Sequence, residues 1–211
     1  MKNRDLESDF TILMQKLRGN GDRGFYPILE KLLKLWDERR IKSNHTIMEV
    51  VLAYELYKRG FEVDVEKPLG NNLVCDIYAT KRGEVEIVEI ETGFVPPENC
   101  LDPGLYRKAR EISKIVRYSP FADIFAFATP PTHILYIDEL FYRRKNKRRA
   151  KKIKGLLDMY YRNPPISLPE ILKAHIEKVY VIDVDECRVM EFSVEEYKEV
   201  RGELVDLTAR F

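Results

Sequence analysis

Residues 46–92 read TIMEVVLAYELYKRGFEVDVEKPLGNNLVCDIYATKRGEVEIVEIET, and this stretch decides the fold. In its first third, apolar side chains recur every three or four residues, as at Ile47, Val50 and Tyr54. This spacing predicts an amphipathic helix over residues 46–58 that ends before Gly60. The apolar period then falls to two, which is typical of β-strands. We therefore expect a helix followed by a three-stranded meander, with strands over residues 61–65, 73–80 and 84–92.

The chain after the meander is predicted to return to the same sheet. Asp102-Pro103 is a helix start, because Asp caps the first turn and Pro tolerates its first position. The apolar residues 124–129 lie between prolines and predict a buried strand, reached through this helical crossover. Together these elements give an α/β fold with the order αβββαβ and a mixed central sheet flanked by helices.

We expect three parts in one chain of 211 residues. Residues 1–42 form a helical N-terminal extension, with helices near 5–17 and 25–39 around a turn at Gly19–Gly21. Residues 43–135 form the core. Residues 136–211 pack on that core as peripheral additions: a helix within 138–161, a hairpin within 179–192, and a last helix capped by Ser193.

Composition narrows the class of protein. No segment approaches the roughly 18 uncharged apolar residues that span a bilayer, and acidic residues occupy the N-terminus where a signal peptide is apolar. The sequence therefore predicts a soluble, cytoplasmic protein without a membrane partner. Three cysteines without paired spacing support neither a disulfide framework nor a structural zinc site. A bias towards Lys, Glu and Arg, with Gln15 the only glutamine, is typical of a thermophilic source.

A net charge of +1 hides a strong internal asymmetry. Residues 104–154 hold 14 Lys/Arg against 4 Asp/Glu, and residues 143–154 alone hold nine basic side chains and no acid. A structural helix face usually pairs Glu with Lys four residues apart, so this run predicts an anionic partner, best met by nucleic acid and above all DNA. The alternative is that this basic run is only the solvent-exposed face of a helix. The predicted phosphate-binding residues are Arg143, Arg144, Lys145, Lys147, Arg148, Arg149, Lys151 and Lys152.

Four carboxylates within the helix and meander are candidates for chemistry. Glu89 and Glu91 share one face of the third strand, and Asp76 lies in the apolar second strand, where an unpaired charge is costly. Neighbouring strands can bring these oxygens into one pocket of the kind that Mg²⁺ or Mn²⁺ prefers. Glu49 could instead complete a capping box with Thr46, and Glu89 and Glu91 could decorate a solvated strand.

This arrangement resembles the PD-(D/E)xK nuclease superfamily, which includes restriction enzymes and archaeal Holliday-junction resolvases. The likeness rests on Glu49 on the helix, Asp76, and Glu89-Ile90-Glu91, in order on an αβββαβ unit. The helix text before Gly60 and the Phe61-Glu62-Val63 that follows are also similar to the opening of the family pattern. The likeness covers about residues 43–130, and it implies a restriction-endonuclease-like core.

The resemblance implies a metal-dependent nuclease that uses Mg²⁺ or Mn²⁺. Asp76 and Glu89 would bind the metal, the Ile90 carbonyl would add a ligand, and Glu49 would reach it directly or through water. Glu91 stands where the family usually has Lys; some members carry that lysine on the following helix, where this chain has Lys108 and Lys114. A carboxylate cluster without a lysine would favour two cations. Because members often act as dimers, the resemblance also suggests a homodimer.

Three functions follow from these patterns. The first is a metal-dependent DNA endonuclease. The second is a catalytically inactive nucleic-acid-binding protein on the same fold, which Glu91 favours. The third is a helical interaction protein with a charged surface, which leaves Asp76 and the basic run unexplained.

Overall fold

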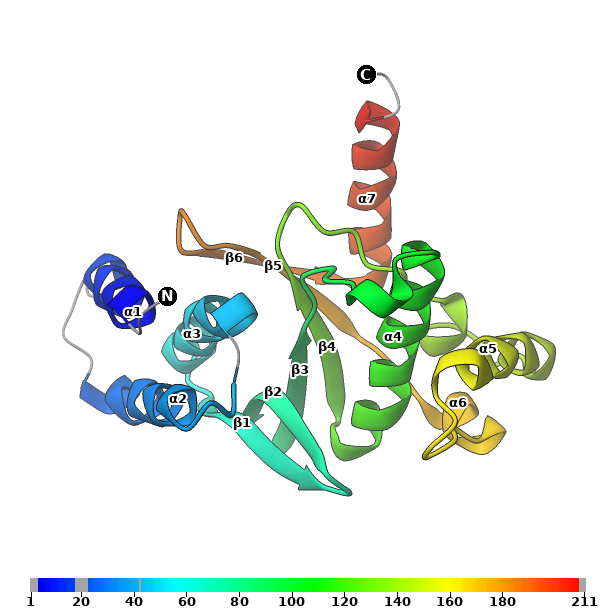
Figure 1. Cartoon of the computed structure of the whole chain (residues 1–211), viewed down its shortest axis with the longest axis horizontal. Coiled ribbons are helices and arrows are strands. Elements are labelled where there is room, and N and C mark those ends of the chain that lie inside the picture. The colour runs from blue at the N-terminus through cyan, green and yellow to red at the C-terminus, as the bar shows by residue number, and fades with distance from the viewer. Residues whose placement is uncertain (1–3, 18–22, 42, 209–211) are drawn as a thin grey trace.

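The computed structural model describes residues 4–17, 23–41 and 43–208. A six-stranded sheet stands between two groups of helices (Figure 1). The strands are β1 (Glu62–Gly70), β2 (Leu73–Lys81), β3 (Glu84–Ile90), β4 (Ile124–Thr129), β5 (Lys178–Asp183) and β6 (Arg188–Ser193). The helices are α1 (Arg4–Leu17), α2 (Tyr26–Asp37), α3 (Ser43–Lys58), α4 (Pro103–Tyr118), α5 (Lys147–Tyr160), α6 (Leu168–Lys173) and α7 (Val194–Thr208).

The strands lie side by side in chain order, from β1 to β6. The β1–β2, β2–β3 and β5–β6 pairs are antiparallel, whereas β3–β4 and β4–β5 are parallel. The parallel β3–β4 pair requires a crossover, and α4 provides it. The Asp102 side chain accepts a hydrogen bond from Leu105 N at the start of α4, as its position before Pro103 predicts. The predicted α/β class and the mixed sheet with flanking helices are confirmed.

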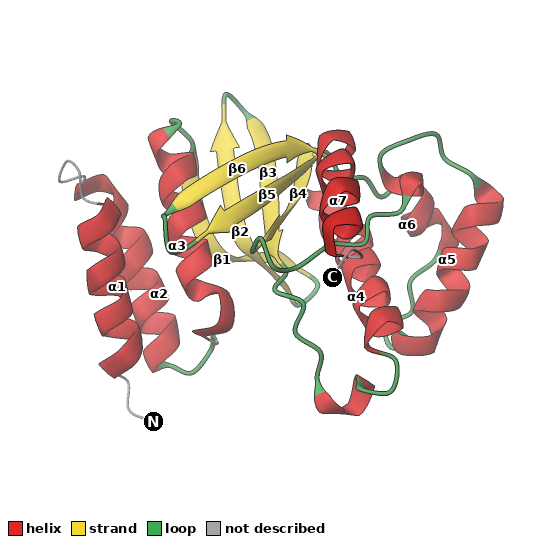
Figure 2. Ribbon diagram, turned by 90° about the horizontal axis from the view of Figure 1, so that it is seen from above, coloured by secondary structure: helices red, strands yellow, loops and turns green. Residues whose placement is uncertain are grey.

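Helices lie on both sides of the sheet (Figure 2), and an apolar core forms on each face. Residues from α1, α2 and α3 cover one face, packing on Ile77, Val88, Ala126 and Ile182. Residues from α4, α5, α6 and α7 cover the other face, packing on Ile87, Phe125, Phe127 and Val179. Because successive strand residues point to opposite faces, β3 and β4 contribute to both cores and are buried on both sides.

The structure departs from the sequence prediction at the C-terminal hairpin. The β5–β6 hairpin is not peripheral, because β5 pairs in parallel with β4 and extends the central sheet. Val179 and Ile182 are fully buried, one in each core, so the apolar run of β5 is a core strand. Ser193 begins α7 through a reciprocal pair of hydrogen bonds with Glu196, as predicted.

Other boundaries differ by a few residues. Helix α3 begins at Ser43, so Thr46 and Glu49 lie inside it. Strand β1 continues to Gly70, beyond the predicted end at Val65. The turn expected at Gly19–Gly21 lies outside the described residues. Within the described part of the chain, no helix is both long and apolar enough to cross a membrane.

Candidate active site

Three acidic side chains meet where β2 and β3 end their pairing. The last pairs of the ladder place Ile77 opposite Val88, so Asp76 and Glu89 are next in line. Beyond these pairs, two backbone N–H groups bond to side-chain carboxylates and not to backbone carbonyls. Ile90 N donates to Asp76 Oδ2 at 2.6 Å, and Asp76 N donates to Glu89 Oε1 at 3.2 Å. These bonds fix both carboxylates relative to the strands that carry them.

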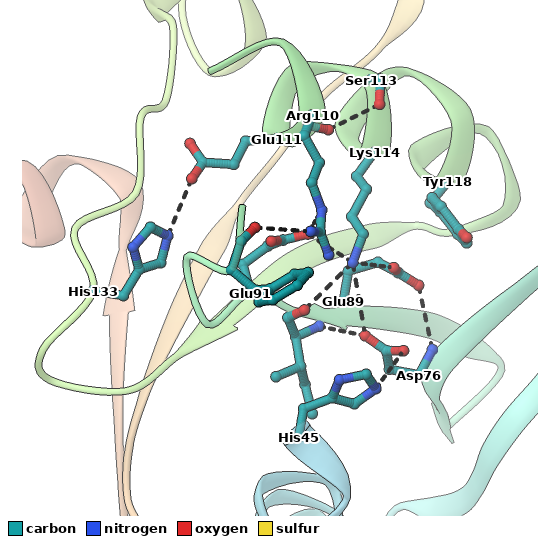
Figure 3. Close-up of polar contacts among 12 residues, drawn as sticks. His45, Asp76, Glu89, Glu91, Arg110, Glu111, Ser113, Lys114, Tyr118 and His133 are labelled. Carbon is teal, nitrogen blue, oxygen red and sulfur yellow. Dashed lines mark hydrogen bonds and ion pairs between the residues drawn. The ribbon is translucent and has the colours of Figure 1, made fainter. Parts of the chain in front are cut away.

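Lys114, on α4, lies at the centre of this cluster (Figure 3). Its Nζ is 2.9 Å from Glu89 Oε2, 2.8 Å from Glu91 Oε1 and 4.0 Å from Asp76 Oδ2. It also donates a hydrogen bond of 3.3 Å to the Ile90 carbonyl. The structure therefore brings Asp76, Glu89, Glu91 and Lys114 together. It places Lys108 elsewhere, with its ammonium 4.1 Å from the centre of the Tyr136 ring.

Burial and charge act against each other in this cluster. Burial lowers the pKa of Lys114, but the carboxylates of Glu89, Glu91 and Asp76 outweigh it and hold that pKa well above its ordinary value. Lys114 is therefore a permanent cation at any ordinary pH. Burial, followed by the charge of Asp76, raises the pKa of Glu89 to about 8, although Lys114 opposes this shift.

Glu91 is held by two cations. In addition to Lys114, Arg110 Nε lies 3.3 Å from Glu91 Oε1, while Arg110 also donates to the Phe94 carbonyl. The Glu91 side chain is only 3% exposed, and its Oε1 makes these ion pairs without a well-aligned hydrogen bond. Glu91 is thus not a free strand decoration. The premise of the two-cation prediction, a cluster without a lysine, is wrong, because Lys114 lies within it.

The segment after β3 is held by a second buried pair. His133 Nε2 lies 3.1 Å from Glu111 Oε1, and Glu111 Oε2 accepts a hydrogen bond from Tyr136 N. The His133 ring packs on Gly93, where an added Cβ would stand 2.5 Å from Nδ1, and Gly93 has a φ of 78°. Only glycine suits this close approach and left-handed backbone. The contact fixes the chain two residues after Glu91.

Glu49 joins a different group of ligands. One ligand atom from each of four side chains lies within 4.8 Å of the others, and these side chains are His45, Glu49, Glu66 and Asp76. Asp76 belongs to both groups: Oδ2 faces Ile90 N and Lys114, whereas Oδ1 lies 3.7 Å from His45 Nε2. Asp76 therefore links the Lys114 cluster to the group that contains Glu49.

The donor set fits a cation. Glu49 is fully buried, and neither of its oxygens has a hydrogen-bond partner among the described residues. The capping-box interpretation is therefore wrong, because Thr46 lies inside α3 and the Glu49 side chain caps nothing. Burial, then Asp76 and Glu66, raises the pKa of Glu49 well above its usual value. A buried carboxyl in this state requires a proton or a metal ion.

Glu66 was not predicted as a site residue. A regular hairpin about Asn71-Asn72 would place Lys67 opposite Asp76, but an irregularity between Pro68 and Gly70 shifts the register by one, so Lys67 pairs with Cys75. Glu66 then lies opposite Asp76. Its φ of 46° is left-handed and interrupts the alternation of β1. The asparagine turn was a visible signal for the hairpin, but the sequence carried none for this bulge.

The basic segment is partly neutralised. Arg149 Nε lies 2.5 Å from Asp138 Oδ1, and Lys154 Nζ lies 2.7 Å from Asp158 Oδ1. Lys145 donates to the Ala174 carbonyl, and Arg143 lies over the Tyr142 ring. The expectation that the run lacks acidic partners is thus wrong for two of its cations. Five others are exposed and have no partner among the described residues: Arg144, Lys147, Arg148, Lys151 and Lys152.

A groove of about 650 Å³ runs between α4 and α5. Lys108 lines it from α4, while Arg148, Arg149 and Lys152 line it from α5. Lys108 and Lys114 are six residues apart on one helix, an axial rise of about 9 Å. The groove and the carboxylate cluster therefore share α4 as a common wall.

Comparisons of the chain with protein-family models, with curated proteins and with solved structures gave no match. The functional argument accordingly rests on the side chains described above.

Proposed function

We propose that the protein is a metal-dependent nuclease that hydrolyses phosphodiester bonds in DNA. One observation supports this most strongly: Asp76, Glu89 and Glu91 converge on the largely buried ammonium of Lys114, and a fourth carboxyl, that of Glu49, lies nearby with no hydrogen-bond partner among the described residues. Stability alone does not explain such a site, because replacing buried charges with apolar side chains often stabilises a protein.

Asp76 and Glu49 would hold a Mg²⁺ or Mn²⁺ ion. When bound, such an ion lowers the pKa of a coordinated water and stabilises the charge that develops on a phosphate. Glu89 orients Asp76 by accepting its backbone N–H, and the Ile90 N–H holds the Asp76 carboxylate. These two hydrogen bonds would hold the Asp76 carboxylate in position for a metal ion.

Lys114 would act as an electrostatic group. Its raised pKa excludes it as a general base, since it keeps its proton at ordinary pH. Its N–H groups face Glu89, Glu91 and the Ile90 carbonyl, so it would act through its positive charge, which would stabilise negative charge in the transition state. Lys114 on α4 thereby supplies the positive charge that Glu91, at the usual lysine position, does not.

The exposed cations of α5 and the α4–α5 groove would bind the DNA backbone. Arg148 and Lys152 both line the groove and are free of acidic partners among the described residues. Phosphate contacts of this kind give affinity without reading sequence.

A cleavage assay tests the proposal. Labelled single-stranded, duplex and four-way-junction DNA are incubated with the protein at elevated temperature, with Mg²⁺, Mn²⁺ or EDTA. We expect cutting that requires the metal, is lost in Asp76→Asn and persists in Glu84→Gln, a matched change at an exposed residue of the same meander. Cutting that survives EDTA or Asp76→Asn would refute the proposal.

A second function remains in view because Glu91 carries the opposite charge to the expected lysine. It is a nucleic-acid-binding protein without catalysis. DNA binding with no cutting of any substrate under any metal condition would favour it over the nuclease.

A further inference from the structure

Two groups of polar side chains that suit a cation adjoin Asp76. In the first group, the Lys114 ammonium contacts Glu89, Glu91 and the Ile90 carbonyl. In the second group, His45 Nε2 lies 3.7 Å from Asp76 Oδ1, and His45, Glu49 and Glu66 present ligand atoms within 4.8 Å of one another and of Asp76. The first position already has its cation. The second consists of three carboxylates and an imidazole.

The first position leaves no room for a metal ion. A metal bound by Asp76, Glu89 and the Ile90 carbonyl would need the place where Lys114 Nζ lies, 2.9 Å from Glu89 and 3.3 Å from Ile90 O. Displacing Lys114 would leave its ammonium largely buried and without its partners, which is costly. The predicted metal ligands Glu89 and Ile90 are therefore engaged by the protein's own cation.

The Glu49 carboxyl gives independent support for cation binding at the second position. Glu49 is 0% exposed, and both of its oxygens lack a partner among the described residues. Its neighbour Glu66 is another carboxyl, so a hydrogen bond between them requires an added proton. A cation between the carboxylates would satisfy them all at once.

We propose that a divalent metal ion binds between His45, Glu49, Glu66 and Asp76, while Lys114 serves as the fixed second cation across Asp76. Glu66 and His45 are then metal ligands, and Glu89 and Ile90 O are not. The ion's part in hydrolysis rests on the proposed function, but its binding does not require turnover.

The ligand set also indicates which ion binds best. The four ligand atoms lie within 4.8 Å of one another, so inward movement of the side chains would let all four contact one divalent ion. An imidazole suits transition ions, whereas Mg²⁺ prefers oxygen ligands and keeps its waters. We expect Mn²⁺ to bind more tightly than Mg²⁺, and His45→Asn to reduce Mn²⁺ affinity more than Mg²⁺ affinity.

Titration calorimetry of the metal-stripped protein with MnCl₂ separates the two positions. Glu66→Gln is expected to lower Mn²⁺ affinity roughly tenfold or more, the scale seen when a metal site loses a supporting group. Glu89→Gln alters a side chain that pairs with Lys114 and lies outside the proposed ligand set, so we expect it to lower Mn²⁺ affinity less than Glu66→Gln does. Glu84→Gln is the matched surface control. A larger loss in Glu89→Gln than in Glu66→Gln would overturn the proposal.

A measurement on the unaltered protein guards against variants that fail to fold. Pulsed electron paramagnetic resonance of bound Mn²⁺ is expected to show coupling to an imidazole nitrogen, which disappears in His45→Asn. Bound Mn²⁺ without nitrogen coupling, or no Mn²⁺ binding, would overturn the proposal. Mn²⁺ binding through Glu66 in a protein that cuts no DNA would retain this site and refute the nuclease, so the two failures are distinguishable.

Discussion

Lys114 Nζ lies 2.8 Å from Glu91 Oε1, so the carboxylate at the position where the PD-(D/E)xK resemblance leads us to expect a lysine is paired with a lysine from α4. The same ammonium holds Glu89 at 2.9 Å. The negative charge of Glu91, just after β3, is thus balanced by a positive charge from the crossover helix α4. This relationship makes Lys114 the central electrostatic residue of the cluster.

Replacing Lys114 with Met keeps most of the side-chain volume and removes the charge. Three nearly buried carboxylates then lose their shared partner, and we expect the free energy of unfolding to fall by about 3–5 kcal/mol at neutral pH. Urea denaturation measures it. The exposed Lys152→Met should stay within about 0.5 kcal/mol of the wild type. An equally small effect for Lys114→Met would contradict the buried-cation assignment.

Glu91→Lys introduces the residue that the PD-(D/E)xK resemblance leads us to expect, yet we expect it to destabilise this protein and abolish the proposed cutting. It would place a third cation beside Arg110 and Lys114, which both lie within 3.3 Å of Glu91 Oε1. The charge swap Glu91→Lys with Lys114→Glu should recover part of the lost stability, because it restores one ion pair. Thermal denaturation of the single and double variants tests this; full stability of Glu91→Lys alone would exclude the argument.

Protons compete with a metal ion for the Asp76 region. Burial, then Asp76, raises the pKa of Glu66 to about 7, so the folded state keeps a proton that the unfolded state releases near its ordinary pKa of 4.5. In EDTA, this group therefore lowers the free energy of unfolding as pH rises from about 4.5 to about 7. Denaturation of wild type and Glu66→Gln across this window isolates the effect, since Gln does not titrate. A flat difference between them would contradict it.

The stabilisation that Mn²⁺ provides is expected to increase with pH. The ion favours the ionised carboxylates and releases protons when it binds, so the Mn²⁺-induced rise in melting temperature should be larger at pH 8 than at pH 6. Differential scanning fluorimetry at fixed Mn²⁺ concentration measures this rise. An equal rise at both pH values would show that binding displaces no proton.

The free cations of α5 should control the salt dependence of DNA binding. Replacing Arg148 and Lys152 with Gln removes two phosphate contacts, and the slope of log affinity against log salt should fall by about 1.8 for duplex DNA. Lys154→Gln should leave the slope unchanged, because Lys154 is already paired with Asp158 at 2.7 Å. Fluorescence anisotropy at several salt concentrations makes the comparison.

Much of the site could be predicted because it follows regular geometry. The two-residue period of β3 puts Glu89 and Glu91 on one face, and the apolar setting of Asp76 signals a buried charge. Lys114 was identifiable as a candidate on α4, although only the packing of α4 on the sheet selects it over Lys108. The role of each residue in catalysis stays a prediction.

The parts that could not be predicted depend on irregular backbone and on distant partners. Glu66 lies opposite Asp76 because of the register shift between Pro68 and Gly70, and its own backbone is left-handed. The two-residue alternation of a strand predicts neither feature. Arg149 is neutralised by Asp138, eleven residues earlier and outside the helix. The position of β5 in the sheet depends on its pairing with β4, a contact between segments far apart in the chain.

In the proposed metal site, the left-handed backbone at Glu66 would couple the outer β1–β2 hairpin to the bound ion. A non-glycine residue in this conformation costs roughly 1–2 kcal/mol, and β1 is an edge strand with only one neighbour to hold it. A bound ion that ligates Glu66 would offset this cost. Amide hydrogen exchange should then slow in the β1–β2 hairpin when metal is added, while the amides of central strand β4 keep their rates. Exchange rates in the edge strand β1 would thus reveal whether the pocket holds a metal ion, without any substrate being present.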